Sequence, residues 1–371
     1  MTTIQDVARH AAVSVSTVSN VLNGRADRMR PETLARVEAT IEALRFSPSN
    51  LARQLKTGQT PLLGLLVPSM ANPMYSTIAR EIETFAQEKF GHRLLLGSTY
   101  RDREKESAFF EDLLAHGVRR VIVISSLVDE RHFESAVERG MVVVSYDRGA
   151  TPGQRSRVGH VMPDNFEAAR LATRHLIDKG HRRLAFATVA GMTMSRGAKI
   201  AGFHAAAEAA GLRSQARVLD GGPLDEYGDS VIAEVGRAVA LHIAGMRQRP
   251  TGIVALNDLM ALGLMAGLRD AGLRVPQDLS IVGIDGLFLS ALSNPMLTTV
   301  ALPVRDMARA MVERAIRPPA EGSEPDTDKV FAPLRLVERE SVAPPPSASR
   351  PAAAPTAAKA KAKPKRNRAA S

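Results

Sequence analysis

The chain has 371 residues, 44% of them hydrophobic and none of them cysteine, which excludes disulfides and thiolate metal sites and favours a cytoplasmic protein. No run of about 18 apolar residues and no secretory leader is present, so we expect neither a membrane span nor export. The formal net charge of +10 is uneven, because residues 1–60 carry +3, residues 343–371 carry +7 and the middle is neutral; this favours a soluble core whose ends meet polyanions.

Residues 3–24 predict two short helices around a tight turn. Apolar residues recur at helical spacing through the first helix: Ile4, Val7, Ala8 and Ala11. Thr3 and Asp6 have the spacing of a capping box, and Ser14 is a favourable N-cap for a second helix whose inner face holds Val18, Val21 and Leu22. The outer face then carries small, uncharged side chains: Val15, Ser16, Ser19 and Asn20. Such a face is typical of a helix that enters the major groove of DNA.

A third helix, from Pro31 to about Leu44, closes an all-α headpiece that we assign to residues 1–46. Pro48 ends it, because the residue before a proline is biased to an extended conformation. Residues 47–60 form a hinge segment, in which residues 49–58 could form one short helix. Such a helix is too short to persist alone in water.

From Leu62 onward, short apolar runs alternate with amphipathic segments. The first series predicts strands at 62–67, 94–98, 121–125 and 141–145, with helices at 74–90, 104–116 and 129–139. The second series predicts strands near 157–162, 184–189, 216–220, 252–256 and 280–284, with helices near 164–179, 197–210, 228–246 and 258–271. Two such series indicate an α/β region of two doubly wound lobes with parallel sheets.

Residues 343–371 contain proline, alanine, serine and lysine, with hardly an apolar side chain larger than alanine. A segment of this composition buries too little surface to offset its ordering entropy, so we predict a disordered basic tail.

The motifs T-I-x-D-V-A, V-S-x-x-T-V-S and V-L-N-G, followed by P-S-N-x-A-R-x-L-x-T-G, occur in this order at the N-terminus. Together they resemble the lactose-repressor (LacI/GalR) family of bacterial transcription regulators. The resemblance runs from residue 2 to about 342. It implies that residues 61–342 form a two-lobed effector-binding and dimerisation domain like the type I periplasmic binding proteins, with lobe crossings near 160, 289 and 320.

The resemblance also implies DNA contacts for the second helix. Asn20 would read a base, since an asparagine amide can pair with adenine N6 and N7. Val15 and Ser16 occupy the other specificity positions, whereas Thr17 and Ser19 would hold phosphates. The alternative is that Asn20 is an ordinary surface residue.

In the hinge segment the family inserts a leucine, here Leu55, into the minor groove as a wedge that kinks the DNA. Four neighbours would support it. Asn50 would cap the helix, Ala52 would allow close approach, and the cations Arg53 and Lys56 would meet phosphates or groove edges. Alternatively, Leu55 packs only against its counterpart in a dimer.

The carboxyl ends of parallel strands line the ligand crevice of open α/β sheets. The resemblance and this rule together predict nine effector-binding residues: Met74, Tyr75, Asp147, Arg148, Asp164, Arg196, Lys199, Val254 and Asp285. Lys199 stands where the family usually carries arginine, and Val254 where many relatives carry an aromatic residue. Asp164 could equally be a helix N-cap, and Asn257 with Asp258 is expected to be structural.

These observations predict a homodimeric regulator, more specifically a repressor, that binds a pseudo-palindromic DNA operator and responds to a small metabolite, with a sugar or sugar acid favoured. A metabolite-responsive activator or dual regulator is the alternative within the family, and a tetramer is possible. Three rivals come from other classes: a transport solute-binding protein, a sugar- or nucleoside-processing enzyme, and a nucleoid-type protein acting through the tail. We find no enzyme motif or zinc-spaced histidine cluster and expect no cofactor or metal.

Overall fold

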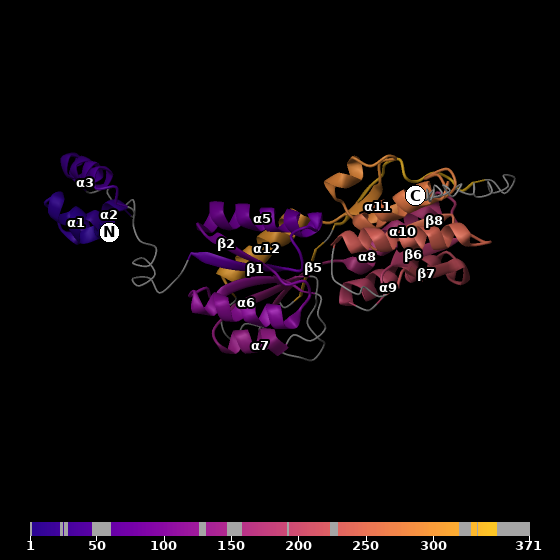
Figure 1. The fold of residues 1–371 in the computed structure, drawn as a ribbon, viewed down its shortest axis with the longest axis horizontal. Helices are drawn as coiled ribbons and strands as arrows, with labels where there is room; N and C mark the ends of the chain where they lie inside the picture. Colours follow the sequence, from indigo (N-terminus) through magenta and orange to yellow (C-terminus); the bar gives the residue numbers. More distant parts are fainter. Residues whose placement is uncertain are drawn as a thin grey trace, which may run out of the picture. The chain divides into compact units, whose positions relative to one another are not determined.

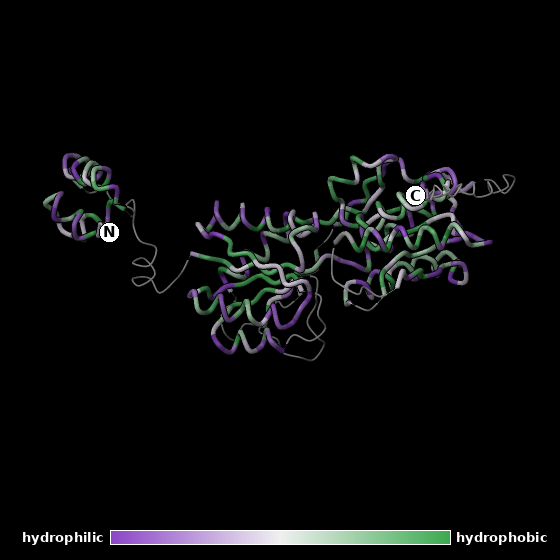
Figure 2. The backbone as a smooth tube through the Cα atoms, in the orientation of Figure 1, coloured by the Kyte–Doolittle hydropathy of each residue, from purple (hydrophilic) through white to green (hydrophobic). Residues whose placement is uncertain are grey.

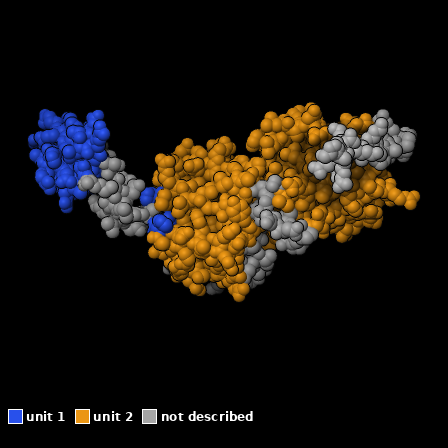
Figure 3. All heavy atoms as spheres, in the orientation of Figure 1, with its two compact units in different colours: residues 1–61, 116–118 blue, residues 62–115, 119–371 orange. Residues whose placement is uncertain are grey.

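The structure is a computed structural model. It describes residues 2–22, 25, 29–46, 61–125, 131–146, 158–190, 193–222, 229–318, 328–331 and 333–346. These residues belong to two compact units, coloured separately in Figure 3: residues 1–61 with 116–118, and residues 62–115 with 119–371. Separate hydrophobic cores form within the headpiece and within the α/β region.

The headpiece consists of α1 (Ile4–His10), α2 (Val15–Leu22) and α3 (Pro31–Ala43). The predicted capping box is confirmed: the Thr3 side chain accepts from the backbone of Asp6, and the Asp6 carboxylate accepts from the backbone of Thr3 at 2.9 Å. The Ser14 hydroxyl accepts from the Thr17 amide at 3.1 Å and so caps α2. Five apolar side chains form the buried centre of the three helices: Val7, Ala8, Ala11, Val18 and Val37.

The first lobe is built on a parallel sheet with strand order β11-β5-β4-β3-β1-β2. Its strands are β1 (Leu62–Val67), β2 (Arg93–Ser98), β3 (Arg120–Ile124), β4 (Val142–Tyr146), β5 (Gly159–Pro163) and β11 (Asp328–Phe331). Its helices are α5 (Pro73–Phe90), α6 (Arg103–Ala115), α7 (Arg131–Glu138) and α12 (Val304–Ile316). In Figure 1, α5 and α12 cover one face of this sheet, and α6 and α7 cover the other.

The second lobe is built on a sheet with strand order β12-β10-β9-β8-β6-β7, parallel except for the pairing of β10 with β12. Its strands are β6 (Leu184–Thr188), β7 (Ala216–Asp220), β8 (Gly252–Ala255), β9 (Ser280–Asp285), β10 (Thr298–Ala301) and β12 (Arg335–Val337). Its α-helices are α8 (Asn165–Asp178), α9 (Met194–Ala209), α10 (Asp229–Gly245) and α11 (Asp258–Asp270), and two short 3-10 helices are η1 (Arg213–Gln215) and η2 (Phe288–Ala291).

The expectation of two doubly wound lobes is confirmed. The chain first crosses between them after β5, which ends at Pro163, close to the expected crossing near 160. Strand β5 pairs with β4 and belongs to the first sheet, although the sequence placed it in the second series. The return to the first lobe comes after β10, which pairs with β9, and not near residue 289. The last crossing follows β11, which pairs with β5, and therefore lies beyond residue 320.

Apolar strands covered by helices on both faces explain the core of each lobe. Strands β6 and β8 are buried along their whole length, and β1 is buried except at its first residue. Figure 2 shows these central segments in the hydrophobic colours, with hydrophilic residues along the outer helix faces. Within the described residues, no helix combines the length and the apolar character that crossing a bilayer requires.

Candidate functional site

Helix α2 presents the exposed polar face that the sequence predicts. Val18 is fully buried against α1 and α3, whereas Val15 is 43% exposed and Ser16 and Asn20 are also exposed. Thr17 and Ser19 are half-buried at the edge of this face, and the Thr17 hydroxyl lies 2.9 Å from the Ser14 hydroxyl. The helix carries no charged side chain, so its outer surface offers only a methyl-bearing residue, hydroxyls and one amide.

Two groups of predicted site residues lie outside the described part of the chain. The first is the hinge set, Asn50, Ala52, Arg53, Leu55 and Lys56, and the second is the pair Asp147 and Arg148 that follows β4.

A cleft between the two lobes of the second unit, which we call the interlobe cleft, gathers side chains from the carboxyl ends of strands in both sheets. Five predicted effector residues line it: Met74, Tyr75, Arg196, Lys199 and Asp285. The first two lie in the first turn of α5, where Asn72 caps the helix by accepting from the Met74 amide at 2.9 Å. Segments more than 200 residues apart in the sequence therefore meet at one site.

The cations on α9 are almost enclosed, since Arg196 is only 6% exposed and Lys199 only 8%. A guanidinium nitrogen of Arg196 donates to the Ala190 carbonyl oxygen at 2.9 Å, and Lys199 Nζ donates to the Leu256 carbonyl oxygen at 3.2 Å. Burial lowers the pKa of Arg196, and the positive charge of Arg101 lowers it further. Burial therefore opposes the charged state of this arginine, and a second cation acts on it from the first lobe.

Asp285 ends β9 with a φ of 136°, a region that L-residues rarely occupy. The residue lines the cleft and is only half-buried. A strained backbone at a ligand crevice is a frequent feature of functional sites, because the surrounding fold holds the side chain in place.

Two predicted effector residues have structural surroundings instead. Asp164 does not appear in the cleft lining; it caps α8, its carboxylate accepting from the Glu167 amide at 2.8 Å. Val254 is fully buried inside β8, among the core residues of the second lobe. The part of this strand's end that lines the cleft lies beyond Val254, at Leu256 and Asn257.

Several cleft residues were missed by sequence reasoning: Asn72, Arg101, Tyr146, Asn165, Thr193 and Ser195. Tyr146 and Asn165 lie next to Asp147 and Asp164, so the rule about strand ends located their neighbourhood. Arg101 could not be predicted in this way. It enters the cleft through a turn in which Tyr100 and Arg101 both have positive φ, a conformation that these residue types do not indicate.

The expected structural role of Asn257 and Asp258 is confirmed. The Asn257 side chain caps α11 by accepting from the Met260 amide at 2.9 Å, although Asn257 also lines the cleft. Asp258 is fully buried and accepts from the Leu287 amide at 2.8 Å, the Ser290 hydroxyl at 2.7 Å and the Thr299 hydroxyl at 2.6 Å. The Asp258 carboxylate therefore links the start of α11 to β10 and to residues 287–290, which follow Asp285 in the chain. Burial raises its pKa.

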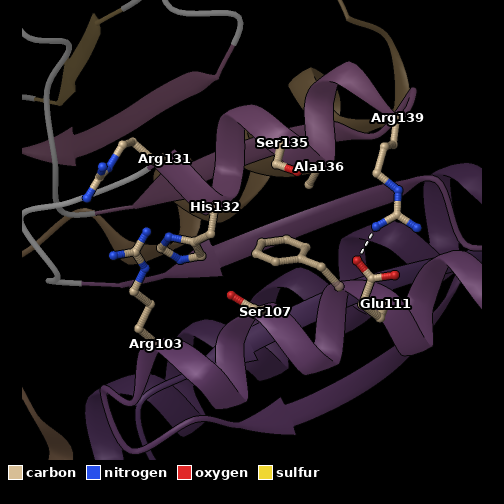
Figure 4. A pocket seen from close by; sticks show the side chains of 9 residues that line it. Arg103, Ser107, Glu111, Arg131, His132, Ser135, Ala136 and Arg139 are labelled. Carbon is tan, nitrogen blue, oxygen red and sulfur yellow. Dashed lines mark hydrogen bonds and ion pairs between the residues drawn. The ribbon is translucent and has the colours of Figure 1, made fainter.

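A second cavity lies between α6 and α7 of the first lobe and shares no lining residue with the interlobe cleft. Figure 4 shows His132 between the two helices, with an ion pair of Arg139 and Glu111 farther along. His132 Nε2 lies 2.8 Å from a carboxylate oxygen of buried Glu106. No predicted site residue lies here, and within the described residues no cluster of potential metal ligands was found.

The chain is similar to known proteins over nearly its whole length. Residues 3–49 match the family model described as bacterial regulatory proteins, lacI family, and residues 173–342 match a periplasmic binding protein-like domain. The HTH-type transcriptional regulator GalR of Escherichia coli strain K12 is 31% identical over 347 residues, a stretch that covers 93% of this chain and 97% of that regulator.

Two solved structures show the same fold. The lac repressor dimer bound to operator and the anti-inducer ONPF matches with a TM-score of 0.77 and 25% identity, over 92% of this chain and 99% of that one. A LacI family transcriptional regulator from Enterococcus faecium, with bound ribose, matches with a TM-score of 0.64 and 26% identity, over 76% of this chain and 99% of that one.

Proposed function

The chain belongs to the lacI family of bacterial regulatory proteins, and we propose that it is a repressor that binds a pseudo-palindromic operator as a homodimer and responds to a small metabolite in the interlobe cleft. The observation that carries this proposal is the exposed, uncharged face of α2, held on the three-helix core of the headpiece. The lac repressor, whose structure is similar, is bound to its operator as a dimer.

We assign base reading to Val15, Ser16 and Asn20, and phosphate contacts to Thr17 and Ser19. The exposed amide of Asn20 suits an adenine edge, and the apolar Val15 suits a thymine methyl. For the hinge segment we propose that Leu55 enters the minor groove, supported by Asn50, Ala52, Arg53 and Lys56. The half-buried hydroxyls of Thr17 and Ser19 lie beside the reading face, which supports the phosphate contacts that we propose for them.

The test selects operators from randomised DNA with the full-length protein and with Asn20→Ala. We expect the wild type to select a two-fold symmetric site. Asn20→Ala should lose about 1–3 kcal/mol of preference at one symmetric base position in each half-site, because one bidentate base contact is removed. Equal weakening at all positions would show that Asn20 holds phosphate, and the absence of any selected sequence would contradict the proposed function.

A homodimer is supported by exposed apolar side chains on the second lobe. Phe288 on η2 is 65% exposed and Leu292, directly after it, is 73% exposed, and Met296 follows nearby. Side chains of this size are seldom left in water in such proximity without a partner surface. A second copy of the chain is the partner we propose, and two headpieces would then read the two half-sites.

The interlobe cleft is the site we propose for the effector, with Met74, Tyr75, Arg196, Lys199 and Asp285 as contacts and Asp147 and Arg148 as further candidates. A hydroxylated metabolite suits the amides, phenols and hydroxyls of the lining. The regulator with bound ribose supports a sugar-like class. Binding there would change operator affinity, and by reciprocity operator binding would change effector affinity by the same factor.

A metabolite-responsive activator or dual regulator remains the alternative within the family, and transcription assays with and without operator distinguish it from a repressor. We propose no enzymatic activity, and turnover assays with candidate metabolites test that statement. Because the ligand we propose is chromosomal DNA, the protein would act in the cytoplasm.

A further inference from the structure

We propose that the amino-terminal end of the second lobe's sheet is a surface that binds duplex DNA without sequence preference. We call it the arginine face, and it consists of residues 180–183, 210–217 and 245–251, the connections that lead into β6, β7 and β8. The interlobe cleft lies at the other end of these strands, where they finish. The proposal goes beyond the function proposed above, which gives DNA binding to the headpiece and the hinge segment.

The arginine face concentrates positive charge within a region that is neutral as a whole. Its three connections contain six arginines and no acid: Arg182, Arg183, Arg213, Arg217, Arg247 and Arg249. Residues 61–342 have no formal net charge, so acids elsewhere in the two lobes balance these cations. All three connections lie within the described residues, so no acid from another part of the chain belongs to them.

The six arginines have no acidic partner within the described residues. Arg182, Arg183 and Arg249 donate to backbone carbonyl oxygens, and the other three make no hydrogen bond there. Five of the six are exposed, and Arg249 is half-buried. Like charges gathered at a surface repel one another and destabilise the folded chain unless opposite charges compensate them. The face is therefore suited to a negatively charged partner.

The neighbouring charged residues do not supply that partner. Lys179 forms an ion pair with Glu338, and Arg274 Nε lies 3.0 Å from a carboxylate oxygen of Asp278. Glu208, exposed in the last turn of α9, makes no printed-distance ion pair with the arginines and leaves them in large excess.

The three connections lie together because β7, β6 and β8 are adjacent strands. Leu184 of β6 is level with Ala216 of β7 and with Gly252 of β8, so the three strands begin at the same height. Arg183 Nε donates to the Arg249 carbonyl oxygen at 2.9 Å, which joins two of the connections directly. Neighbouring strands lie about 4.8 Å apart, so their starts span about 10 Å. Duplex DNA carries one phosphate charge per about 1.7 Å of its axis, so several phosphates can meet the face at once.

A cavity of about 230 Å³ opens among these connections and adds uncharged donors to the arginines. Its lining includes Arg183 and Arg217 together with Ser214, Gln215 and Gln248. The planar guanidinium group matches the geometry of a phosphate, and hydroxyl and amide side chains are further donors to the DNA backbone. The composition of the face is thus that of a backbone-binding surface.

The basic tail begins beside the face, and this favours a long polyanion over a small anion. His181 Nε2 lies 2.9 Å from the Ala343 carbonyl oxygen, and Pro345 lies next to Gly180. The residues after 346 carry seven more cations and no acid. A single phosphate cannot engage charges spread over three connections and the segment that follows, whereas a duplex offers a continuous row of phosphates. Because the headpiece of this family holds the protein on DNA, duplex DNA is the polyanion at the highest local concentration.

The test measures binding of a short random-sequence duplex by the full-length protein from low to moderate salt. The face variant combines Arg213→Gln, Arg217→Gln and Arg247→Gln, three exposed side chains that make no hydrogen bond within the described residues. We expect it to bind the duplex about tenfold more weakly at low salt. Its log–log salt slope should be flatter by up to about 2.7, because each lost phosphate contact removes about 0.9.

A matched control removes the same charge outside the face. It combines Arg80→Gln, Arg305→Gln and Arg335→Gln, which are exposed arginines of both lobes. The control should bind the duplex with the affinity and the salt slope of the wild type. Both variants should unfold at the wild-type temperature, so that a difference in binding reports on the face and not on folding.

Three results would overturn the proposal. The first is an equal salt slope for the face variant, the control and the wild type. The second is a face variant that keeps its DNA affinity but loses binding of labelled polyglutamate or of duplex RNA, which would identify another macromolecule as the partner. The third is a face variant that keeps its DNA affinity but loses stabilisation by inorganic phosphate, which would identify a small-anion site. The headpiece is the same in all three proteins, so the comparison decides this proposal even if no operator is selected, an outcome that would contradict the proposed function instead.

Discussion

The buried ring of His181 makes the free energy of unfolding depend on pH. Its ring is fully buried, with Nε2 2.9 Å from the Ala343 carbonyl oxygen and Nδ1 3.1 Å from the Thr251 hydroxyl. Burial lowers the pKa of His181 below its ordinary value of 6.5. The unfolded chain therefore takes up this proton before the folded protein does. The contribution of the neutral His181 ring to the free energy of unfolding is fully present above about pH 6.5. It is lost as the pH falls from there through the lower pKa of the folded state.

We expect His181→Gln to be less stable than the wild type at neutral pH but to lose less free energy of unfolding between pH 7.5 and pH 5. One differential proton corresponds to a slope of about 1.4 kcal/mol per pH unit at most. Urea unfolding at several pH values measures the slope. The exposed His242, changed to glutamine, serves as the control. An unchanged slope in His181→Gln would mean that other groups cause the acid sensitivity, such as His175, whose pKa burial also lowers.

At the scale of elements, the close packing of α10 and α11 predicts that a glycine-to-alanine change lowers stability, whereas helix propensity alone predicts that it raises stability. Gly263 lies in α11 where it crosses α10, and an added Cβ would overlap the Ala233 carbonyl. Alanine normally favours a helix over glycine by about 1 kcal/mol. Gly263→Ala should nevertheless destabilise the protein by about 1–3 kcal/mol, because the helices must move apart. Gly245, at the end of α10 with open space around it, is the control, and Gly245→Ala should be neutral or stabilising.

The elements also show which parts of the fold the sequence could predict. Long apolar strands and capped helices were found within a few residues, because their pattern and their caps are local. Strands β10 and β11 were missed: each has four residues, and each exists through pairing with a distant strand. The same limit applies to the cleft. Residues at strand ends were expected. Arg101 reaches the site because Tyr100 and Arg101 both have positive φ, and neither residue type predicts such a turn.

For the whole molecule, the proposed dimer predicts that surface apolar residues control operator affinity from outside the headpiece. We expect Phe288→Ser combined with Leu292→Ser to remain folded, because both side chains are exposed in the single chain. The variant should sediment as a monomer and bind its operator far more weakly, since one headpiece buries too little surface for tight binding. Leu241→Ser removes a 59% exposed leucine from α10 and should change neither property. A double variant that stays dimeric would place the interface elsewhere.

The charge distribution of the whole chain makes the last prediction. The tail from residue 343 carries seven cations and no acid, while residues 61–342 are neutral. Cations that meet DNA contribute counterion release, and each phosphate they engage adds about 0.9 to the log–log salt slope. A chain ending after the described residue 346 removes all seven. We expect it to bind operator and random DNA more weakly by similar factors and with a flatter salt dependence, because the α2 face still selects the sequence. Binding isotherms from low to moderate salt test this. Identical slopes for both chains would show that the tail does not touch the DNA, and loss of sequence preference would show that it contributes to recognition.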